Sequence, residues 1–129
     1  DVVPAGGIAA QEPVLAEQDS PYSNRIHVDD LAAACVAAMQ RGVAGAIYNV
    51  SDGHPTTMTD FFYRVADAAG LPRPPSITLA EAAGQLSDGM RSYLAESKRL
   101  DNRRLREGLG VKLRYPTLDD GLRAGAGIV

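Results

Sequence analysis

The sequence has little cysteine, few aromatic residues and no tryptophan. Cys35 is the one cysteine in 129 residues, so neither a disulfide framework nor a zinc site built from several cysteines forms within one chain. This composition favours a cytoplasmic protein. No apolar run approaches the roughly 20 residues of a membrane-spanning helix. The chain also does not open with the basic segment followed by an apolar segment that is typical of a signal peptide. The sequence therefore predicts a soluble protein with no membrane partner.

A surplus of positive charge is also absent. Lysine and arginine total 13 against 16 aspartate and glutamate residues, which gives a net charge of −3 and an isoelectric point of about 5.3. This balance creates no general attraction for nucleic acid or for an anionic membrane. Seven of the 13 cationic residues do gather between Lys98 and Arg114. Acidic residues interrupt that segment and only Tyr115 is near for base stacking, so a solvated helix face is favoured over nucleic-acid binding.

Motifs that bind phosphate, metal or an acyl group through a fixed spacing are missing. There is no G-x-G-x-x-G, no P-loop, no G-x-S-x-G and no group of histidines and cysteines with metal-ligand spacing. The glycines of Gly6-Gly7 and Gly42-x-x-Gly45 lack the strand–turn–helix context of a phosphate loop. The sequence therefore predicts no metal site and no catalytic residues of these classes.

What is present is enough apolar sequence for one domain. At 129 residues and 45% hydrophobic composition, the chain is long enough to bury a core. It begins at Asp1 rather than at a methionine, which indicates a fragment of a longer protein. With few long helices and 5% aromatic residues to cover the central strands, we expect apolar surface around Ile26, Val28 and Ile47 to be exposed or covered by a partner.

The chain is organised around a strand that runs into a helix. Residues 25–28 alternate between polar and apolar side chains, which is the period of a strand. Asp29 or Asp30 is then predicted to cap a helix from about Leu31 to Arg41. The apolar stripe of this helix is expected to contain Leu31, Ala34, Cys35, Ala38 and Met39, with Cys35 as a buried, inert thiol.

Further elements follow from capping and turn signals. Short strands are expected at Val14–Leu15, at Ala46–Val50 in parallel with residues 25–28, and at Val111–Tyr115. Helices are expected after Thr57 and ending at Gly70, from Leu79 to Leu86 behind Thr78, from Gly89 to about Leu94 behind Asp88, over 103–109 behind Asn102, and after Thr117. The order predicts an α/β fold with short parallel strands and several helices.

Arg25 and His27 are candidate binding residues because both point to one side of the predicted strand. A guanidinium there could grip a phosphate or carboxylate with two hydrogen bonds. The alternative is an ion pair of Arg25 with Asp29 or Asp30, beside a hydrogen-bonded structural His27, and residue types alone favour this alternative. Tyr93 likewise has a functional and a structural interpretation: it lines a pocket, or it is a half-buried residue that packs against its neighbours.

Three segments, taken in order, resemble the C-terminal portion of the extended or atypical short-chain dehydrogenase/reductases (SDRs), the NAD-dependent epimerase/dehydratase family. NRIHVDDLAAACVAAMQRG is similar to that family's R-x-F/I/V-H/Y-V-x-D strand-to-helix junction. AGAIYNVSDGHPTTMTDFFYRVADAAGLP is similar to the following G-x-x-F/Y-N-V/I strand and its helix. SKRLDNRRLREGLGVKLRYPTLDDGLRAG is similar to the family's terminal segment. Together the matches cover about residues 23–125.

The resemblance implies that residues 1–129 are the C-terminal, substrate-binding portion of a Rossmann-type extended SDR whose cofactor domain is absent from the chain. The full-length protein from which this fragment comes, called the parent protein below, would use NAD or NADP. This fragment alone would bind neither. The family's catalytic Tyr-x-x-x-Lys does not occur, because no tyrosine here has a lysine four residues on. By itself the fragment is therefore not expected to be an active enzyme.

Four residues are assigned to substrate binding by this resemblance. Arg25, with His27 beside it, matches the family arginine that often contacts a nucleotide-sugar phosphate. Arg91 and Tyr93 lie near the family's R-P-G-D segment, but Met90-Arg91-Ser92-Tyr93 departs from it. That departure favours the atypical branch over nucleotide-sugar enzymes.

Three functional hypotheses follow. In the first, the chain is the substrate-binding part of an NAD(P)-dependent epimerase, dehydratase or reductase, whose partners are a small-molecule substrate and the missing N-terminal Rossmann domain. In the second, it belongs to a non-catalytic dinucleotide-binding sensor or interaction module of the same fold. Nucleic-acid binding through residues 98–114 is the third, and it would show an affinity that falls steeply with salt. The sequence also leaves a homodimer open.

Overall fold

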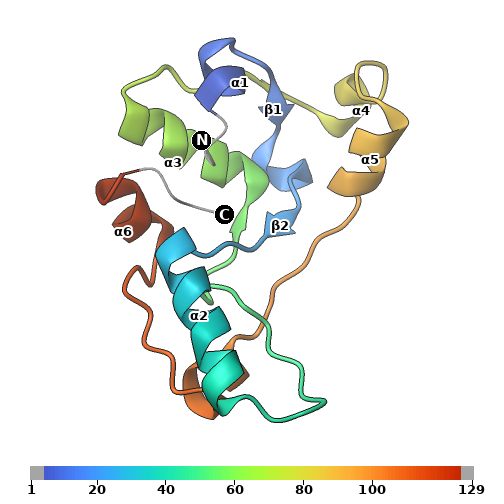
Figure 1. Ribbon diagram of the computed structural model, residues 1–129. Helices are drawn as coiled ribbons and strands as arrows, with labels where there is room; N and C mark the ends of the chain where they lie inside the picture. The colour runs from blue at the N-terminus through green and yellow to red at the C-terminus, as the bar shows by residue number, and fades with distance from the viewer. Residues whose placement is uncertain (1–4, 126–129) are drawn as a thin grey trace. The chain divides into compact units, whose positions relative to one another are not determined.

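The computed structural model describes residues 5–125 and divides into two compact units. Unit 1 is formed by Asn24–Pro55 and by the chain from residue 100 to residue 125, and unit 2 by residues 5–23 and 56–99. Unit 1 is built on one long helix, whereas unit 2 combines shorter helices with two small sheets (Figure 1). The predicted α/β class is therefore confirmed.

The sheets of unit 2 each contain two short strands. Strand β1 (Val14–Leu15) pairs in parallel with β4 (Ser76–Ile77), so that Val14 lies opposite Ser76 and Leu15 opposite Ile77. Strand β2 (Tyr22–Ser23) pairs antiparallel with β3 (Thr56–Thr57). The predicted strand at Val14–Leu15 is confirmed. The helices of unit 2 are α1 (Ala5–Ala9), the 3-10 turn η1 (Glu17–Asp19), α3 (Met58–Ala69), α4 (Leu79–Ala82) and α5 (Asp88–Leu94).

Helix α3 begins and ends where the sequence predicts. The Thr57 side chain accepts a hydrogen bond from the Asp60 backbone N–H at 3.1 Å, which satisfies one of the unpaired donors of the first turn. Gly70 ends the helix in the left-handed conformation with φ of 67°, which a residue without Cβ adopts at little cost. Because both signals lie within one turn of the helix, they act without help from the rest of the fold.

Two other predicted caps are confirmed. Thr78 and Glu81 form a reciprocal capping box at the start of α4, which nevertheless ends at Ala82 instead of Leu86. Thr117 and Asp120 form the same motif at the start of α6 (Leu118–Arg123) in unit 1. Short polar side chains at these positions satisfy backbone donors that would otherwise be unpaired.

The core of unit 1 joins α2 (Val28–Arg41) to the segment around residues 105–111. It contains Ile26, Ala34, Ala37, Leu105, Leu109 and Val111, and Leu31, Tyr48, Val50 and Leu113 pack against it. The Arg41 Nε donates to the Leu109 carbonyl at 2.9 Å, which ties the end of α2 to this segment. The segment's own turn, η2 (Arg104–Gly108), is a π-helix rather than the predicted α-helix.

The predicted start of α2 is wrong by three residues. The helix begins at Val28, and the Nδ1 atom of His27 accepts a hydrogen bond from the Asp29 N–H at 3.1 Å, so His27 is the N-cap. Asp29 and Asp30 lie inside the first turn. Because His27 ends the extended backbone, the segment 25–28 is not a regular strand.

The predicted apolar stripe of α2 is confirmed for Leu31 and Ala34, which belong to or pack against the unit 1 core, and is wrong for the other three residues. The buried positions are Asp30, Ala34 and Ala37, whereas Cys35 and Ala38 are exposed and the Met39 side chain is 87% exposed. A helix with small apolar residues on every side has no unique apolar face, so its packing partners select the buried face. Cys35 is therefore not the buried thiol that was predicted.

Two predicted strands and one predicted cap are not formed. Residues 46–50 and 111–115 pair in no strand ladder within the described chain. The N–H groups of Arg114 and Tyr115 donate to the Asp30 carboxylate instead of to a strand. Asn102 uses its side chain to donate to the Ser51 carbonyl at 2.9 Å and to accept from Arg106, and so does not cap a helix.

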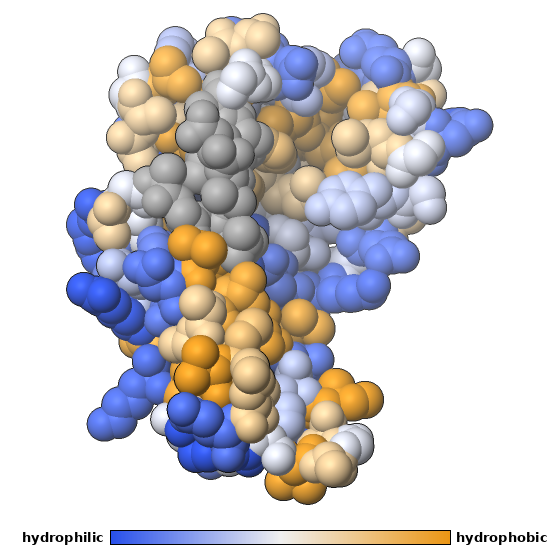
Figure 2. All heavy atoms as spheres, in the orientation of Figure 1, coloured by the Kyte–Doolittle hydropathy of each residue, from blue (hydrophilic) through white to orange (hydrophobic). Residues whose placement is uncertain are grey.

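The expected exposed apolar surface is present in part. Val28 is 40% exposed and Ile47 is 73% exposed, but Ile26 is buried in the unit 1 core. Val36 and Met39 extend this surface along α2, where apolar residues gather in the space-filling view (Figure 2). The prediction is therefore confirmed for Val28 and Ile47 and wrong for Ile26.

Candidate functional site

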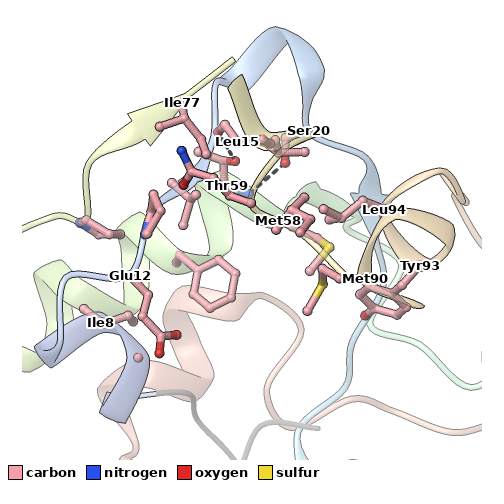
Figure 3. Close-up of a pocket in the computed structure, with 18 residues that line it drawn as sticks. Ile8, Glu12, Leu15, Ser20, Met58, Thr59, Ile77, Met90, Tyr93 and Leu94 are labelled. Atoms are coloured by element: carbon pink, nitrogen blue, oxygen red, sulfur yellow. Dashed lines mark hydrogen bonds between the residues drawn. The ribbon is translucent and has the colours of Figure 1, made fainter. Parts of the chain in front are cut away.

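Unit 2 contains a partly open, mostly apolar cavity of about 400 Å³. Its walls come from the loop around β1, from the start of α3, from β4 and from the segment that holds α4 and α5. Figure 3 shows Ile8 and Glu12 on one side of the cavity and Met90 and Tyr93 on the other. A cavity of this size, lined mainly by apolar side chains, is typical of small-molecule sites.

Thr59 holds one wall of the cavity in place. Its hydroxyl donates to the Leu15 carbonyl at 2.6 Å, and its backbone N–H donates to the Ser20 Oγ at 3.0 Å (Figure 3). Thr59 is only 1% exposed, so these hydrogen bonds replace those that water would make. They join the first turn of α3 to the end of β1 and to the loop before β2.

The four residues assigned to substrate binding divide between the units. Tyr93 lines the unit 2 cavity and is 59% exposed. Arg91 lies two residues earlier on α5, is exposed, and pairs with Asp88 on the same helix. Arg25 and His27 lie in unit 1. Substrate binding by these four residues stays a prediction.

Arg25 and His27 are both buried, with 7% of each residue exposed. Besides capping α2, the His27 ring stacks on the Tyr115 ring with centroids 3.9 Å apart, which supports the structural alternative for His27. Asp52 lies within the electrostatic influence of Arg25, and the Asp52 N–H donates to the Arg25 carbonyl at 2.8 Å. The carboxylate of Asp30, one of the partners proposed for Arg25, accepts from the backbone of residues 114 and 115.

Burial raises the pKa of Asp52 above its ordinary value of 3.8. The His54 backbone N–H, which donates to the Asp52 Oδ1 at 2.8 Å, and the charges of Arg25 and His54 act in the opposite direction but are weaker. The folded chain thus binds the Asp52 proton more tightly than the unfolded chain does. This contribution to stability is present below the ordinary pKa and is lost as the pH rises through the folded-state pKa.

We expect Asp52→Asn to change the pH dependence of stability. Asparagine keeps an oxygen that can accept from the His54 N–H but has no charge to desolvate. The variant should therefore gain stability relative to the unsubstituted chain as the pH rises: the difference between their free energies of unfolding, variant minus unsubstituted, should be larger at about pH 7 than at about pH 3. Urea unfolding of both chains at the two pH values measures this. A relative stability that moves the other way would show that attraction to Arg25 outweighs burial.

Most cationic side chains of the segment 98–114 have partners. Arg103 pairs with Asp101 at 2.7 Å, and Lys98 pairs with Glu96 at 2.7 Å. Arg106 donates to the Asn102 side chain, and Arg99 and Arg114 lie over the rings of Tyr22 and Tyr115. The interpretation of this segment as a solvated face stays a prediction.

Four residues that line the cavity are not predicted by the sequence pattern: Met58, Thr59, Phe62 and Met90. Helical spacing assigned Phe62 to packing, and no local pattern related the start of α3 to the segment around α5. Only the folded chain brings these residues to one cavity.

Residues 5–125 contain no cluster of three or more histidine, cysteine or acidic side chains placed to hold a metal ion. In the same range, no helix has both the length and the apolar character needed to cross a bilayer, and α2 has only 14 residues.

The α/β architecture is similar to that of an epimerase. A nucleoside-diphosphate-sugar epimerase from Pseudomonas aeruginosa superposes with a TM-score of 0.67 and 30% identity, over 81% of this chain and 34% of the epimerase. A conserved protein of unknown function from Silicibacter pomeroyi gives a TM-score of 0.74 and 40% identity, over 81% of this chain and 37% of that protein.

A reductase is similar in sequence. The 3-diazoavenalumate denitrifying reductase of a Streptomyces species is 31% identical over 108 residues, which are 84% of this chain and 35% of the reductase. No family model matches the chain. The chain spans about a third of the length of each of these relatives. The similarities support an SDR- or epimerase-like family of oxidoreductases and epimerases.

Proposed function

We propose that this chain is the substrate-binding part of an NAD(P)-dependent oxidoreductase or epimerase of the SDR type, and that the unit 2 cavity receives the substrate. The observation that carries the proposal is the joint similarity to a reductase and to a nucleoside-diphosphate-sugar epimerase, which extends over more than four fifths of the chain. The cavity supplies the concave, mostly apolar surface that such a role requires.

Gly6, Gly7 and Gly42, among the residues that the structure describes, do not form a phosphate loop for a dinucleotide. Gly6 and Gly7 lie within the short helix α1, and Gly42 caps the end of α2. Neither position places glycine N–H groups between a strand and a helix, where a pyrophosphate binds in a Rossmann fold. NAD or NADP would therefore be held by the rest of the parent protein, together with its catalytic acid and base.

The contribution of this chain is to bind and orient the substrate and to exclude water. Phe62, Met58 and Met90 offer apolar surface along the cavity, and the Tyr93 hydroxyl offers a polar group that can donate or accept. The hydrogen bonds of Thr59 fix the position of the wall from which Met58 and Phe62 extend. Holding a substrate in one orientation lowers the barrier for a reaction carried out by groups outside the cavity.

A segment exchange tests this proposal. The segment of the Streptomyces reductase that matches this chain is replaced by this chain. The chimera is given NADH or NADPH together with 3-diazoavenalumate and a panel of aromatic and sugar-nucleotide compounds. We expect consumption of reduced nicotinamide with at least one compound, at a preference that differs from that of the intact reductase. Absorbance of the reduced nicotinamide measures the rate.

Two matched variants show whether the cavity is responsible. Met90→Trp fills part of the cavity wall at a position that is 45% exposed, whereas Met39→Trp adds the same ring at an exposed position outside the lining. The first should raise KM or lower kcat/KM about tenfold, and the second should change neither. A folded chimera that binds nicotinamide without turnover of any compound would contradict the proposal and favour the non-catalytic sensor or interaction module.

A further inference from the structure

The charged residues that line the unit 2 cavity restrict the kind of ligand it can bind. Among the described residues that line it, Glu12 is the one acidic residue, and no lysine, arginine or histidine takes part. The chain as a whole has 13 lysines and arginines. Their absence from the described lining is therefore not explained by a low content of basic residues. A phosphate bound here would meet a carboxylate and no positive charge.

Several backbone donors along the α3, α4 and α5 walls are also in use. The N–H groups of Gln85 and Leu86 both donate to the Ala82 carbonyl, and the Met90 N–H donates to the Ser87 Oγ at 3.2 Å. The Thr59 N–H is bonded to Ser20. A phosphate needs several such donors or cationic side chains to offset the loss of its hydration, and these donors are already paired.

The remaining surface suits a flat apolar ring. The rings of Phe62 and Tyr93 and the side chains of Met58 and Met90 all line the cavity, and Figure 3 shows Met58, Met90 and Tyr93 on the same side of it. Methionine sulfur and aromatic rings both make favourable contacts with an aromatic ligand. Polar groups that can orient such a ligand come from Tyr93, Gln85 and Glu12.

We infer that the unit 2 cavity binds a flat, uncharged aromatic molecule and discriminates against compounds that carry a phosphate or diphosphate. This inference rests on the proposal that the cavity is the substrate site, and it names the class of substrate. The chemistry of the wall thus distinguishes this chain from a site built for a nucleotide sugar, even though one of its structural relatives is an epimerase of nucleoside-diphosphate sugars.

The three methionines of the chain provide a direct test. Met58 and Met90 line the cavity, whereas Met39 lies in unit 1, is 87% exposed and is not part of the lining. The 129-residue chain is labelled with ¹³C at its methionine methyl groups and titrated with 2-naphthol or with 2-naphthyl phosphate, which differ in charge but share one ring system. Methionine-to-leucine variants assign the three signals.

We expect 2-naphthol to shift the signals of Met58 and Met90 but not that of Met39. The phosphate should bind about tenfold more weakly or not at all, because its charge would be buried without a partner. Met90→Arg, at a half-exposed position of the wall, should weaken naphthol binding and strengthen binding of the phosphate, with Met58 as the reporter. Met39→Arg adds the same charge outside the lining and should leave both affinities unchanged.

Other results would overturn the inference in distinguishable ways. Equal or tighter binding of the phosphate at Met58 and Met90 would show an anion site, and the cavity could still be the substrate site. Shifts of all three methionines alike would show unspecific adsorption of the ring. If neither probe shifts Met58 or Met90, the cavity does not accept this class, and the segment exchange decides the proposed function independently.

Discussion

Replacing Leu105 with alanine is expected to lower the free energy of unfolding of unit 1 by about 3 kcal/mol. The Leu105 side chain is fully buried and belongs to the cluster that joins α2 to the segment after residue 100. Its removal leaves a cavity between Ile26, Leu109 and their neighbours, which the surrounding backbone cannot fully close. Urea unfolding, followed through the amide signals of α2, reports unit 1 rather than the whole chain.

Met39→Ala is the matched control for this prediction. Met39 is also apolar and lies on the same unit, but it is 87% exposed. Its truncation should change the free energy of unfolding by less than about 0.5 kcal/mol. Similar losses for the two variants would mean that the exposed side of α2 is covered in solution and that Leu105 is not the centre of the core.

Replacing Asp30 with alanine is expected to destabilise unit 1 by about 3 kcal/mol. Asp30 is 2% exposed, and its carboxylate accepts from the N–H groups of Arg114 and Tyr115 at 2.8 and 2.9 Å. Without it, two backbone donors lose their acceptor, and the segment that carries Tyr115, which stacks on His27, is no longer held against α2. The free energy of unfolding and the amide signals of residues 114 and 115 measure both effects.

Asp29→Ala separates this role from a general effect of charge at the helix start. Asp29 precedes Asp30 in the first turn of α2, but 57% of its side chain is exposed. Loss of its favourable position near the positive end of the helix should cost no more than about 1 kcal/mol. If Asp29→Ala were as damaging as Asp30→Ala, the stability of α2 would depend on its N-terminal charge instead of on the link to residues 114 and 115.

Asp29 and Asp30 have a structural role in the folded chain, but not the capping role that the sequence predicts. The strand-to-helix junction was expected to supply a carboxylate cap, and His27 supplies the cap instead. Asp30 bonds to backbone groups that lie more than 80 positions away. A carboxylate in a first turn can serve its own helix or another segment equally well, and only the folded neighbourhood determines which one it serves.

The sequence by itself determined the features that depend on groups within one helical turn. The caps at Thr57, Thr78 and Thr117 and the end of α3 at Gly70 all formed as predicted. Each threonine side chain accepts a hydrogen bond from a backbone N–H only a few residues away, and Gly70 ends its helix through its own backbone conformation. Interactions within one turn therefore determine these helix ends. The α/β class followed from the order of these elements.

Only the tertiary structure decided which faces and segments meet. The alanine-rich helix α2 could pack with several faces, and contact with Leu105 and Leu109 selected Ala34 and Ala37 while leaving Met39 exposed. Residues 46–50 and 111–115 have strand-like sequences, but a strand also needs a partner for its backbone groups, which local sequence does not specify. The unit 2 cavity likewise arises where β1, α3 and α5 come together, because its chemistry depends on side chains that are distant along the chain.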